Sequence, residues 1–267
     1  MASTLAITSS NRIDQRFAEL REGGRKALVC YVTAGFPDAD RSLELLQGLA
    51  DAGADVVEIG VPFSDPIADG PVIQQSSQQA LDAGMNLGRC LDLVRRAELQ
   101  VPVVLFSYLN PILAAGASVL ERAADAGIDG VLVTDLPLGA DPAREAWLGE
   151  SDLAFIRLVA PTTPPARMKD IARNGSGFVY LISRLGVTGI QSLSGIPADL
   201  PRTANLLRGA TTLPICVGFG IATPDQATSV AAIADGVVVG SALVRAASES
   251  VESALSLTRT LRTALDA

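Results

Sequence analysis

The sequence has no histidine and only two lysines, Lys26 and Lys169. Without histidine, acid–base chemistry has to use carboxylate, tyrosine or lysine side chains, and metal sites built on imidazole are excluded. The three cysteines, Cys30, Cys90 and Cys216, have no CxxC spacing, and their number is odd. We therefore expect reduced, buried thiols and no disulfide framework.

Membrane-spanning and export signals are also missing. No apolar run reaches the length of a membrane span, and residues 1–11 lack the charged and apolar blocks of a signal peptide. The net charge is −8, from 21 basic and 29 acidic residues, and no basic stripe is present. We expect a cytoplasmic protein that binds neither nucleic acid nor membranes. Because the net negative charge of the protein repels anions, an anionic substrate would have to be held by favourable groups within the binding site itself.

Aromatic residues make up only 4% of the chain, whereas hydrophobic residues make up 48%. A core of Ala, Val, Ile and Leu suits a parallel sheet covered by helices. Short apolar segments alternate with segments of helical periodicity, such as Ser42–Ala52, Val119–Ala126, Ala166–Ala172 and Asp225–Ile233. The predicted strands are Ala27–Thr33, Val56–Ile59, Pro102–Phe106, Gly130–Val133, Phe155–Val159, Phe178–Ile182, Ile215–Gly218 and Gly236–Val239.

This alternation predicts an α/β protein made of eight right-handed βαβ units, which close into a (β/α)8 TIM barrel. We expect a single domain over residues 1–267, with residues 1–10 flexible. An extra helix near Ile13–Arg21 precedes the first strand and is expected to cover the floor of the barrel.

Local signals predict where helices begin and end. Thr223, Asp141 and Thr163 each precede a proline, which is typical of a capping residue followed by the first helical turn. Gly53 and Gly127 lie in Asp-Ala-Gly turns between a helix and a strand, where a positive φ is expected. We interpret these turns as part of the face that stabilises the fold.

The loop after the second predicted strand carries three carboxylates. Active sites in this fold lie at the C-terminal ends of the strands. Glu58 interrupts an apolar strand and points inward if Val56 does, because strand side chains alternate. A carboxyl group there is either structural or a general acid–base with a pKa raised by burial, and we favour the second interpretation. Asp65 and Asp69 could be catalytic, or they could be a turn residue and a helix cap.

Two further features lie at the same rim. The long glycine-rich segment 183–197 after the sixth strand is interpreted as a mobile active-site lid. The seventh strand ends in 218–220 (GFG) and the eighth in 240–241 (GS). Turns here commonly bind phosphate, because glycine lets backbone N–H groups approach an oxyanion, although the same glycines could serve only to make tight turns. Tyr31 and Tyr180 lie in strands near the barrel mouth, and each could either line a pocket or fill the core.

Several segments resemble one known family, the tryptophan synthase α subunits. Residues 57–71, VEIGVPFSDPIADGP, resemble the signature of that family, and residues 178–189, FVYLISRLGVTG, resemble its lid. Residues 217–221, VGFGI, and 234–241, ADGVVVGS, are similar to its phosphate turns. The segments YVTAGFP at 31–37, SYLNP at 107–111 and TDLP at 134–137 also fit, and the matches run in order over nearly the whole chain.

The resemblance implies a lyase that performs retro-aldol cleavage of indole-3-glycerol phosphate to indole and glyceraldehyde 3-phosphate, in tryptophan biosynthesis. Glu58 would be the acid–base residue, Asp69 would bind the indole N–H, and Thr188 would orient Asp69 when the lid closes. The resemblance places the phosphate at Gly189, Gly218, Phe219, Gly220, Gly240 and Ser241. It places the indole along Tyr31, Phe106, Leu132 and Tyr180.

The resemblance also implies a partner. It predicts no metal and no cofactor in this chain, and a β subunit carrying pyridoxal phosphate in an αββα heterotetramer. Pro62, Asp65 and Asn110 would face that subunit, and Asp135 would lie near the active site.

Three other functions are considered beside this one. A Schiff-base aldolase needs a lysine at the C-terminal end of a strand, whereas Lys26 precedes a strand and Lys169 lies in a predicted helix. A non-catalytic regulatory subunit would not need both Glu58 and Asp69. A stand-alone indole producer without a β partner stays open.

Overall fold

The computed structural model describes residues 11–183, 197, 199–218 and 220–267. Its eight strands are parallel and pair in chain order, and β8 pairs with β1, so the sheet closes into a barrel. The strands are β1 (Ala27–Thr33), β2 (Val56–Gly60), β3 (Val103–Ser107), β4 (Gly130–Val133), β5 (Ala154–Val159), β6 (Val179–Ile182), β7 (Ile215–Gly218) and β8 (Gly236–Val239). The predicted (β/α)8 barrel is confirmed, and every predicted strand end lies within one residue of the observed one.

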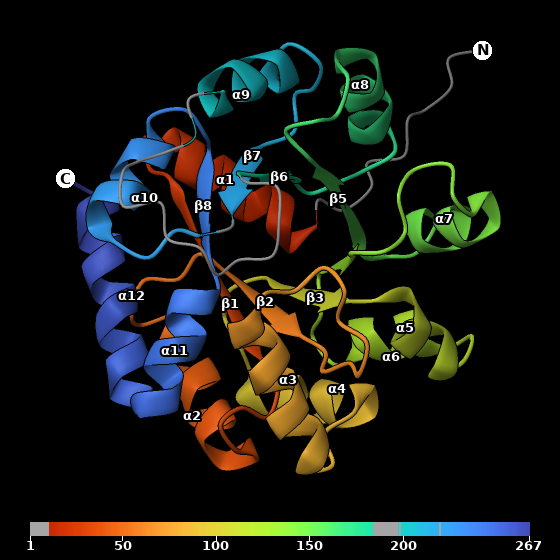
Figure 1. Ribbon diagram of the computed structural model, residues 1–267, viewed down its shortest axis with the longest axis vertical. Coiled ribbons are helices and arrows are strands. Elements are labelled where there is room, and N and C mark those ends of the chain that lie inside the picture. The colour runs from red at the N-terminus through yellow and green to blue at the C-terminus, as the bar shows by residue number, and fades with distance from the viewer. Residues whose placement is uncertain (1–10, 184–196, 198, 219) are drawn as a thin grey trace, which may run out of the picture.

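Helices surround the barrel (Figure 1). They are α1 (Arg12–Glu22), α2 (Ala39–Leu49), α3 (Pro71–Asp82), α4 (Leu87–Ala97), α5 (Leu109–Ala114), α6 (Val119–Asp125), α7 (Pro142–Gly149), α8 (Pro165–Arg173), α9 (Leu200–Arg208), α10 (Pro224–Ala231), α11 (Ser241–Glu249) and α12 (Val251–Leu265). Among the residues described, no helix has the length and apolar character needed to cross a membrane.

Two predicted helices end earlier than expected, Ser42–Ala52 at Leu49 and Asp225–Ile233 at Ala231, and two predicted helix starts differ from the observed ones. The helix predicted at Ser42–Ala52 begins earlier, at Ala39, because the Asp38 side chain accepts a hydrogen bond from the Arg41 N–H and caps it. The cap predicted at Thr163 is wrong, because Pro164 occupies the N-cap position and the Thr163 hydroxyl accepts a hydrogen bond from the Ala160 N–H instead.

The other local predictions are confirmed. Thr223 forms a capping box with Gln226, and Asp141 accepts a hydrogen bond from the Arg144 N–H at the start of α7. Gly53 and Gly127 have φ values of +102° and +95°, as the predicted turns require. The three cysteines are buried and free.

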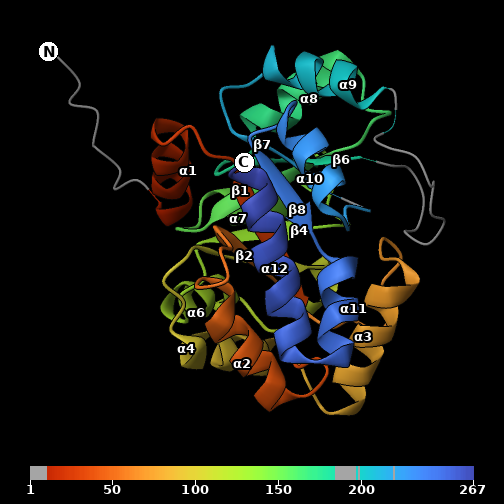
Figure 2. The same cartoon turned by 90° about the vertical axis from the view of Figure 1, so that its left-hand side faces the viewer.

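Inward-facing side chains and α1 together close the floor of the barrel. Val29 and Tyr31 of β1, Val104 of β3 and Phe178 before β6 belong to one buried cluster with residues of α1. The Phe17 ring of α1 packs against Phe178 with 5.7 Å between ring centroids. Figure 2 shows α1 at one end of the barrel, away from α3 and α11. α1 thus covers the N-terminal end of the barrel, opposite the strand ends at which the active sites of this fold lie.

Aspartates that directly precede strands stabilise the floor. Asp55, Asp129 and Asp235 each accept a hydrogen bond at Oδ2 from a backbone N–H of the preceding strand, at 2.8, 2.8 and 2.9 Å. The backbone N–H of each aspartate also donates to the carbonyl of the residue that its side chain binds, which is Leu28, Val103 or Ile215. The side chain and the backbone of each aspartate therefore both hold the two neighbouring strands together. Asp55 and Asp129 lie two residues after Gly53 and Gly127, so the Asp-Ala-Gly turns belong to the face that stabilises the fold, as predicted.

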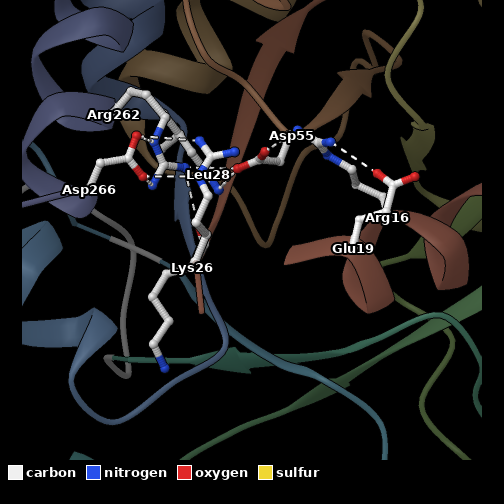
Figure 3. A network of polar contacts seen from close by, with 8 residues as sticks. Arg16, Glu19, Lys26, Leu28, Asp55, Arg262 and Asp266 are labelled. Carbon is white, nitrogen blue, oxygen red and sulfur yellow. Dashed lines mark hydrogen bonds and ion pairs between the residues drawn. The ribbon is translucent and has the colours of Figure 1, made fainter. Parts of the chain in front are cut away.

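Asp55 has the most charged partners of the three. It accepts hydrogen bonds from Arg16 of α1 at 2.6 Å and from Arg262 of α12 at 2.9 Å (Figure 3). Arg262 also donates to the Lys26 carbonyl at 3.0 Å, which ties the C-terminal helix to the floor, and pairs with Asp266 at the end of its own helix. One buried carboxylate thus joins the first helix, the second strand and the last helix.

Candidate active site

The C-terminal end of the barrel holds a pocket that gathers most of the predicted site residues. It is lined by Tyr31, Glu58, Asp69, Gly70, Ile73, Phe106, Tyr180, Gly220, Val238, Gly240 and Ser241. Both predicted catalytic carboxylates lie in it, together with aromatic side chains from β1, β3 and β6 and the turns after β7 and β8. Side chains from distant segments meet here because the C-terminal ends of parallel strands converge at one rim.

Glu58 is a fully buried carboxyl group in the middle of β2. It is paired in register with Tyr31 of β1 and Val104 of β3, and its exposed fraction is 0%. Within the described residues, neither carboxyl oxygen has a hydrogen-bond partner. Loss of hydration disfavours the charged form, so burial raises the pKa of Glu58 to about 8. A proton on this carboxyl is therefore held near neutral pH and is available for transfer.

Asp69 lies in the loop between β2 and α3, and its side chain is not a helix cap. Gly70 is the N-cap residue of α3, and no side chain caps that helix. The Asp69 carboxylate instead accepts a hydrogen bond from the Tyr108 hydroxyl at 3.0 Å. Burial raises the pKa of Asp69 to about 6, and the hydrogen bond from Tyr108 opposes this increase. Asp69 thus remains ionised at a pH where Glu58 is protonated.

Tyr31 and Tyr180 are at once buried residues and pocket residues. Tyr31 packs edge-on against Phe106 at 5.2 Å between centroids. A Cβ at Gly60 would overlap the Tyr31 hydroxyl, and a Cβ at Gly218 would overlap the Tyr180 hydroxyl. Gly218 therefore makes room for a tyrosine, a steric role that is independent of any phosphate.

The two turns that the sequence predicts to bind phosphate lie at the pocket, as far as the structure describes them. Gly220 has a φ of +84°, and Gly240 is the N-cap residue of α11, which lacks a side-chain cap. Ser241 is the first residue of that nine-residue helix, and all three residues line the pocket. The first-turn N–H groups and the dipole of α11 favour an anion at this end of the pocket.

Some predicted site residues lie elsewhere. Leu132 is fully buried in the barrel interior and is not among the residues that line the pocket. Thr188, Gly189 and Phe219 lie outside the described residues, as does most of the predicted lid, 183–197.

The predicted partner residues differ in exposure. Pro62 is buried, whereas Asp65 and Asn110 are exposed, the first on the loop after β2 and the second in α5. Ile67, which the sequence reasoning did not single out, is 80% exposed on the same loop. Nothing in the sequence marks Ile67, because the same loop carries Phe63 and Ala68, and the exposure of its side chain is seen in the fold.

Tyr108, which contacts a site residue, is one that the sequence reasoning missed, as are Gly70, Ile73 and Val238, which line the pocket. Tyr108 is 3% exposed, directly follows β3, and reaches across to Asp69 and to the Ala68 N–H, which donates to its hydroxyl at 2.9 Å. The signal that could have identified it is its place, because a polar aromatic residue at the C-terminal end of a barrel strand faces the rim.

Neither a metal centre nor a second cavity offers an alternative site in the described part of the chain. No group of three or more His, Cys, Asp or Glu residues in the described part of the chain could hold a metal ion. A larger cavity, of about 480 Å³, lies outside the barrel and is lined by residues of α7, β5 and α8. Its buried charges, Arg157 and Glu145, pair with each other at 2.8 Å, so we assign the site to the barrel mouth.

Comparisons with known proteins agree with this assignment. The sequence model described as "Tryptophan synthase alpha chain" matches residues 17–265. A relative from Geobacter sulfurreducens with that name is 51% identical, over 88% of this chain and 89% of its own. One from Desulfatibacillum aliphaticivorans is 48% identical, over 90% and 91%.

Solved structures show the same relationship. A tryptophan synthase structure from Mycobacterium tuberculosis superposes with a TM-score of 0.87 at 33% identity, covering 96% of this chain and 99% of that chain. The tryptophan synthase subunit alpha from Legionella pneumophila gives a TM-score of 0.87 at 34% identity, covering 97% and 99%. The family model matches most of this chain, two relatives share about half of their aligned residues with it, and the barrel mouth holds two carboxyl groups. The chain therefore belongs to the tryptophan synthase alpha chain family.

Proposed function

We propose that Glu58 and Asp69 carry out the reaction of this family, the retro-aldol cleavage of indole-3-glycerol phosphate to indole and glyceraldehyde 3-phosphate. The chain is a carbon–carbon lyase of tryptophan biosynthesis. One observation carries the assignment of roles. Two carboxyl groups share one pocket, and their surroundings raise one pKa to about 8 and the other only to about 6. Separated pKa values of this kind are typical of an acid and an anion with different tasks.

The protons balance with these two groups. Protonated Glu58 gives its proton to C3 of the indole ring, which leaves a positive charge on the ring, centred at its nitrogen. The Asp69 carboxylate accepts a hydrogen bond from the indole N–H and stabilises that charge. Glu58, now ionised, removes the proton from the adjacent substrate hydroxyl as the carbon–carbon bond breaks. The electron pair of that bond returns to the ring, glyceraldehyde 3-phosphate leaves as an aldehyde, and Glu58 is protonated again.

Binding of the two substrate ends follows from the same pocket. Tyr31, Phe106 and Tyr180 provide an aromatic and apolar wall for the indole ring. Gly240 and Ser241 at the N-terminus of α11 provide backbone N–H groups for the phosphate, which the overall charge of −8 would otherwise repel. The roles of Thr188, Gly189 and Phe219, and of the lid, stay predictions from the sequence.

A partner completes the proposal. Indole is small and apolar, so an enzyme that makes it benefits from direct transfer to the enzyme that uses it. We propose that the chain binds no cofactor of its own and docks on a β subunit that carries pyridoxal phosphate, in an αββα heterotetramer. The exposed residues Asp65, Ile67 and Asn110 lie near the mouth of the barrel and support this location.

The alternatives are weaker or stay open. The Schiff-base mechanism is disfavoured, because Lys26 precedes β1 and donates to the Ala234 carbonyl on the floor, and Lys169 lies in α8. A non-catalytic subunit would not need the unpaired buried carboxyl of Glu58, which costs stability. A stand-alone indole producer remains the second candidate, because its site would be the same.

Turnover of indole-3-glycerol phosphate tests the proposal. The purified chain alone, and the chain with a β subunit, are incubated with substrate, and indole and glyceraldehyde 3-phosphate are measured. We expect equal amounts of both products, slowly from the isolated chain and faster with the β subunit. Absence of both products under both conditions would contradict the lyase assignment. Full activity of the isolated chain with no gain from the β subunit would favour the stand-alone indole producer.

A further inference from the structure

Tyr108 connects two parts of the barrel rim that are distant in sequence. Its hydroxyl donates to Asp69 Oδ2 at 3.0 Å and accepts from the Ala68 N–H at 2.9 Å. These two residues belong to the loop after β2, whereas Tyr108 follows β3 and is the N-cap residue of α5. The contact with Asp69 spans 39 positions of the chain.

We propose that Tyr108 is a positioning residue for the reaction, which fixes one oxygen of Asp69 so that the other faces the substrate. A tyrosine hydroxyl has one proton and two lone pairs. Because the Ala68 N–H occupies a lone pair, the hydroxyl proton is directed to Asp69 Oδ2. Oδ1 then remains available for the indole N–H. The inference rests on the role of Asp69 in the proposed function.

The tyrosine itself is held before any substrate binds. Its ring packs on Phe63 of the same loop, with 5.1 Å between centroids and 35° between planes. The next residue, Leu109, donates its N–H to Asp135 at 2.7 Å, which anchors the start of α5. Asp135, expected near the site from the sequence, thus fixes the backbone beside Tyr108 and does not line the pocket. A donor fixed in advance costs no reorganisation when the ring cation forms.

The electrostatic surroundings of Asp69 give the proposal a measurable consequence. Apart from Asp69 itself, three titratable groups line the pocket, namely Glu58 of β2, Tyr31 of β1 and Tyr180 of β6. Within the described residues, the side-chain hydrogen bond to the Asp69 carboxylate comes from Tyr108. That bond lowers the pKa of Asp69 against the effect of burial. Removing the hydroxyl should therefore raise the pKa at which Asp69 ionises.

The test uses Tyr108→Phe and Asp69→Asn, singly and together, in the full chain with its β subunit. Tyr108→Phe keeps the ring that packs on Phe63 and removes only the hydroxyl. We expect kcat/KM at pH 7 to fall by about 10-fold, the scale of one hydrogen bond to a charged group. We also expect the acid limb of the pH profile of kcat/KM to move to higher pH. In the Asp69→Asn background, Tyr108→Phe should have little further effect, because the group on which the hydroxyl acts is gone.

A second variant keeps the test independent of folding. Replacing Tyr108 with 3-fluorotyrosine retains the shape of the side chain and makes the hydroxyl a stronger donor. The acid limb should then move to lower pH, the opposite of its movement in Tyr108→Phe. A merely structural tyrosine would move the limb in neither variant.

The outcomes separate this inference from the proposed function. If Asp69→Asn turns over substrate at the wild-type rate, the proposed role of Asp69 fails, and the role of Tyr108 fails with it. If Asp69→Asn is severely impaired but Tyr108→Phe and the fluorotyrosine variant keep the wild-type pH profile, only the positioning role is overturned. Equal loss from Tyr108→Phe in the wild-type and Asp69→Asn backgrounds would also overturn it.

Discussion

At the scale of single residues, the two pocket carboxyl groups differ in what surrounds them. Glu58 has no hydrogen-bond partner among the described residues, so its pKa rises to about 8. Asp69 is less completely enclosed and is bonded by Tyr108, so its pKa rises only to about 6. At pH 7, Glu58 is mostly protonated and Asp69 mostly ionised, which is the state in which the proposed reaction begins.

The first prediction concerns the proton carried by Glu58. Glu58→Gln should lower kcat by at least ~100-fold, the lower end of what a positioned acid–base residue contributes. Glutamine has nearly the same shape but cannot transfer a proton. Steady-state turnover of indole-3-glycerol phosphate measures the effect, and turnover within a few-fold of wild type would rule out the assigned role.

A folding measurement is the control for this variant. The folded-state pKa of Glu58, about 8, lies above its ordinary value of 4.5, so the folded chain binds the proton more tightly than the unfolded chain. This group therefore makes the free energy of unfolding fall as pH rises from about 4.5 to about 8, by at most about 1.4 kcal/mol per pH unit. Glu58→Gln should lack this part of the pH dependence, and denaturant unfolding at several pH values measures it.

The second prediction is a bell-shaped pH profile of kcat/KM, with its limbs near pH 6 and pH 8. Below the lower limb, Asp69 gains a proton and no longer stabilises the ring cation. Above the upper limb, Glu58 loses the proton that C3 must receive. The residual activity of Asp69→Asn should lack the acid limb, and an acid limb that persists in this variant would assign it to another group.

At the scale of elements, the aspartates in the turns that precede β2, β4 and β8 stabilise the floor of the barrel. The Asp55 side chain is 1% exposed and pairs with Arg262, whose side chain is 9% exposed. The Asp235 side chain is 33% exposed and pairs with Arg208, which is 47% exposed. Both aspartates accept a hydrogen bond from a backbone N–H of the preceding strand, but the ion pair of Asp55 is buried, whereas that of Asp235 is exposed to solvent.

The third prediction compares these two turns. Asp55→Ala should lower the free energy of unfolding by about 3 kcal/mol, because it removes the buried carboxylate that pairs with Arg262 and Arg16 and accepts the Leu28 N–H, and leaves Arg262 with the partly exposed Asp266 as its ion-pair partner. Asp235→Ala, the matched control, should cost about 1 kcal/mol, mainly from the lost backbone hydrogen bond. Urea or guanidinium unfolding measures both, and equal losses would show that the buried ion pair adds nothing.

The fourth prediction concerns the turns after β7 and β8. Gly218→Ala should displace Tyr180 from the pocket wall and lower kcat/KM by about 10-fold or more, a loss on the scale expected for a misplaced wall of a site. Gly240→Ala should be mild, because a Cβ there makes only ordinary contact with Tyr31 at 3.5 Å. Kinetics of the two variants, side by side, measure the difference.

A larger side chain at position 240 separates sterics from phosphate binding. Gly240→Val should raise KM strongly, because its side chain extends into the space assigned to the phosphate. Inorganic phosphate should also compete with substrate in the wild type but not in this variant. Unchanged KM and unchanged competition in Gly240→Val would place the phosphate elsewhere.

At the scale of the whole molecule, one loop carries both an assigned active-site residue and assigned partner residues. Asp69 and the exposed Asp65 lie on the same side of the barrel, between β2 and α3, and Asp65 accepts a local hydrogen bond from Ser64 at 2.5 Å. A partner that binds this loop in its active conformation would favour that conformation, since a ligand shifts an equilibrium by its differential affinity.

The fifth prediction follows from this coupling. Asp65→Ala should weaken binding of the β subunit and lose its activation of turnover, while the slow activity of the isolated chain stays mostly intact. Asp125→Ala is the matched control, because Asp125 is an exposed carboxylate at the C-terminal end of α6, on the opposite face of the barrel. Calorimetry with the β subunit and turnover assays measure both quantities. Equal binding by Asp65→Ala and wild type would move the interface elsewhere.

Local patterns in the sequence determined the barrel itself. The two-residue period of a strand placed Glu58 inward with Val56, and Thr223 and Asp141 marked the starts of helices. The resemblance added which carboxylates to examine. Each of these inferences depends on residues that are adjacent or a few positions apart, so it needs no knowledge of how the chain closes on itself.

Only the tertiary structure decided what the site residues meet. By its sequence Asp69 could have been a helix cap, but its carboxylate instead accepts a hydrogen bond from the hydroxyl of Tyr108, which follows another strand. Gly218 could have served a phosphate alone, and it is Tyr180 of the neighbouring strand that requires it. Closure of the barrel brings the ends of different strands together, and the partner of a side chain at that rim depends on the register between strands, which no local pattern contains.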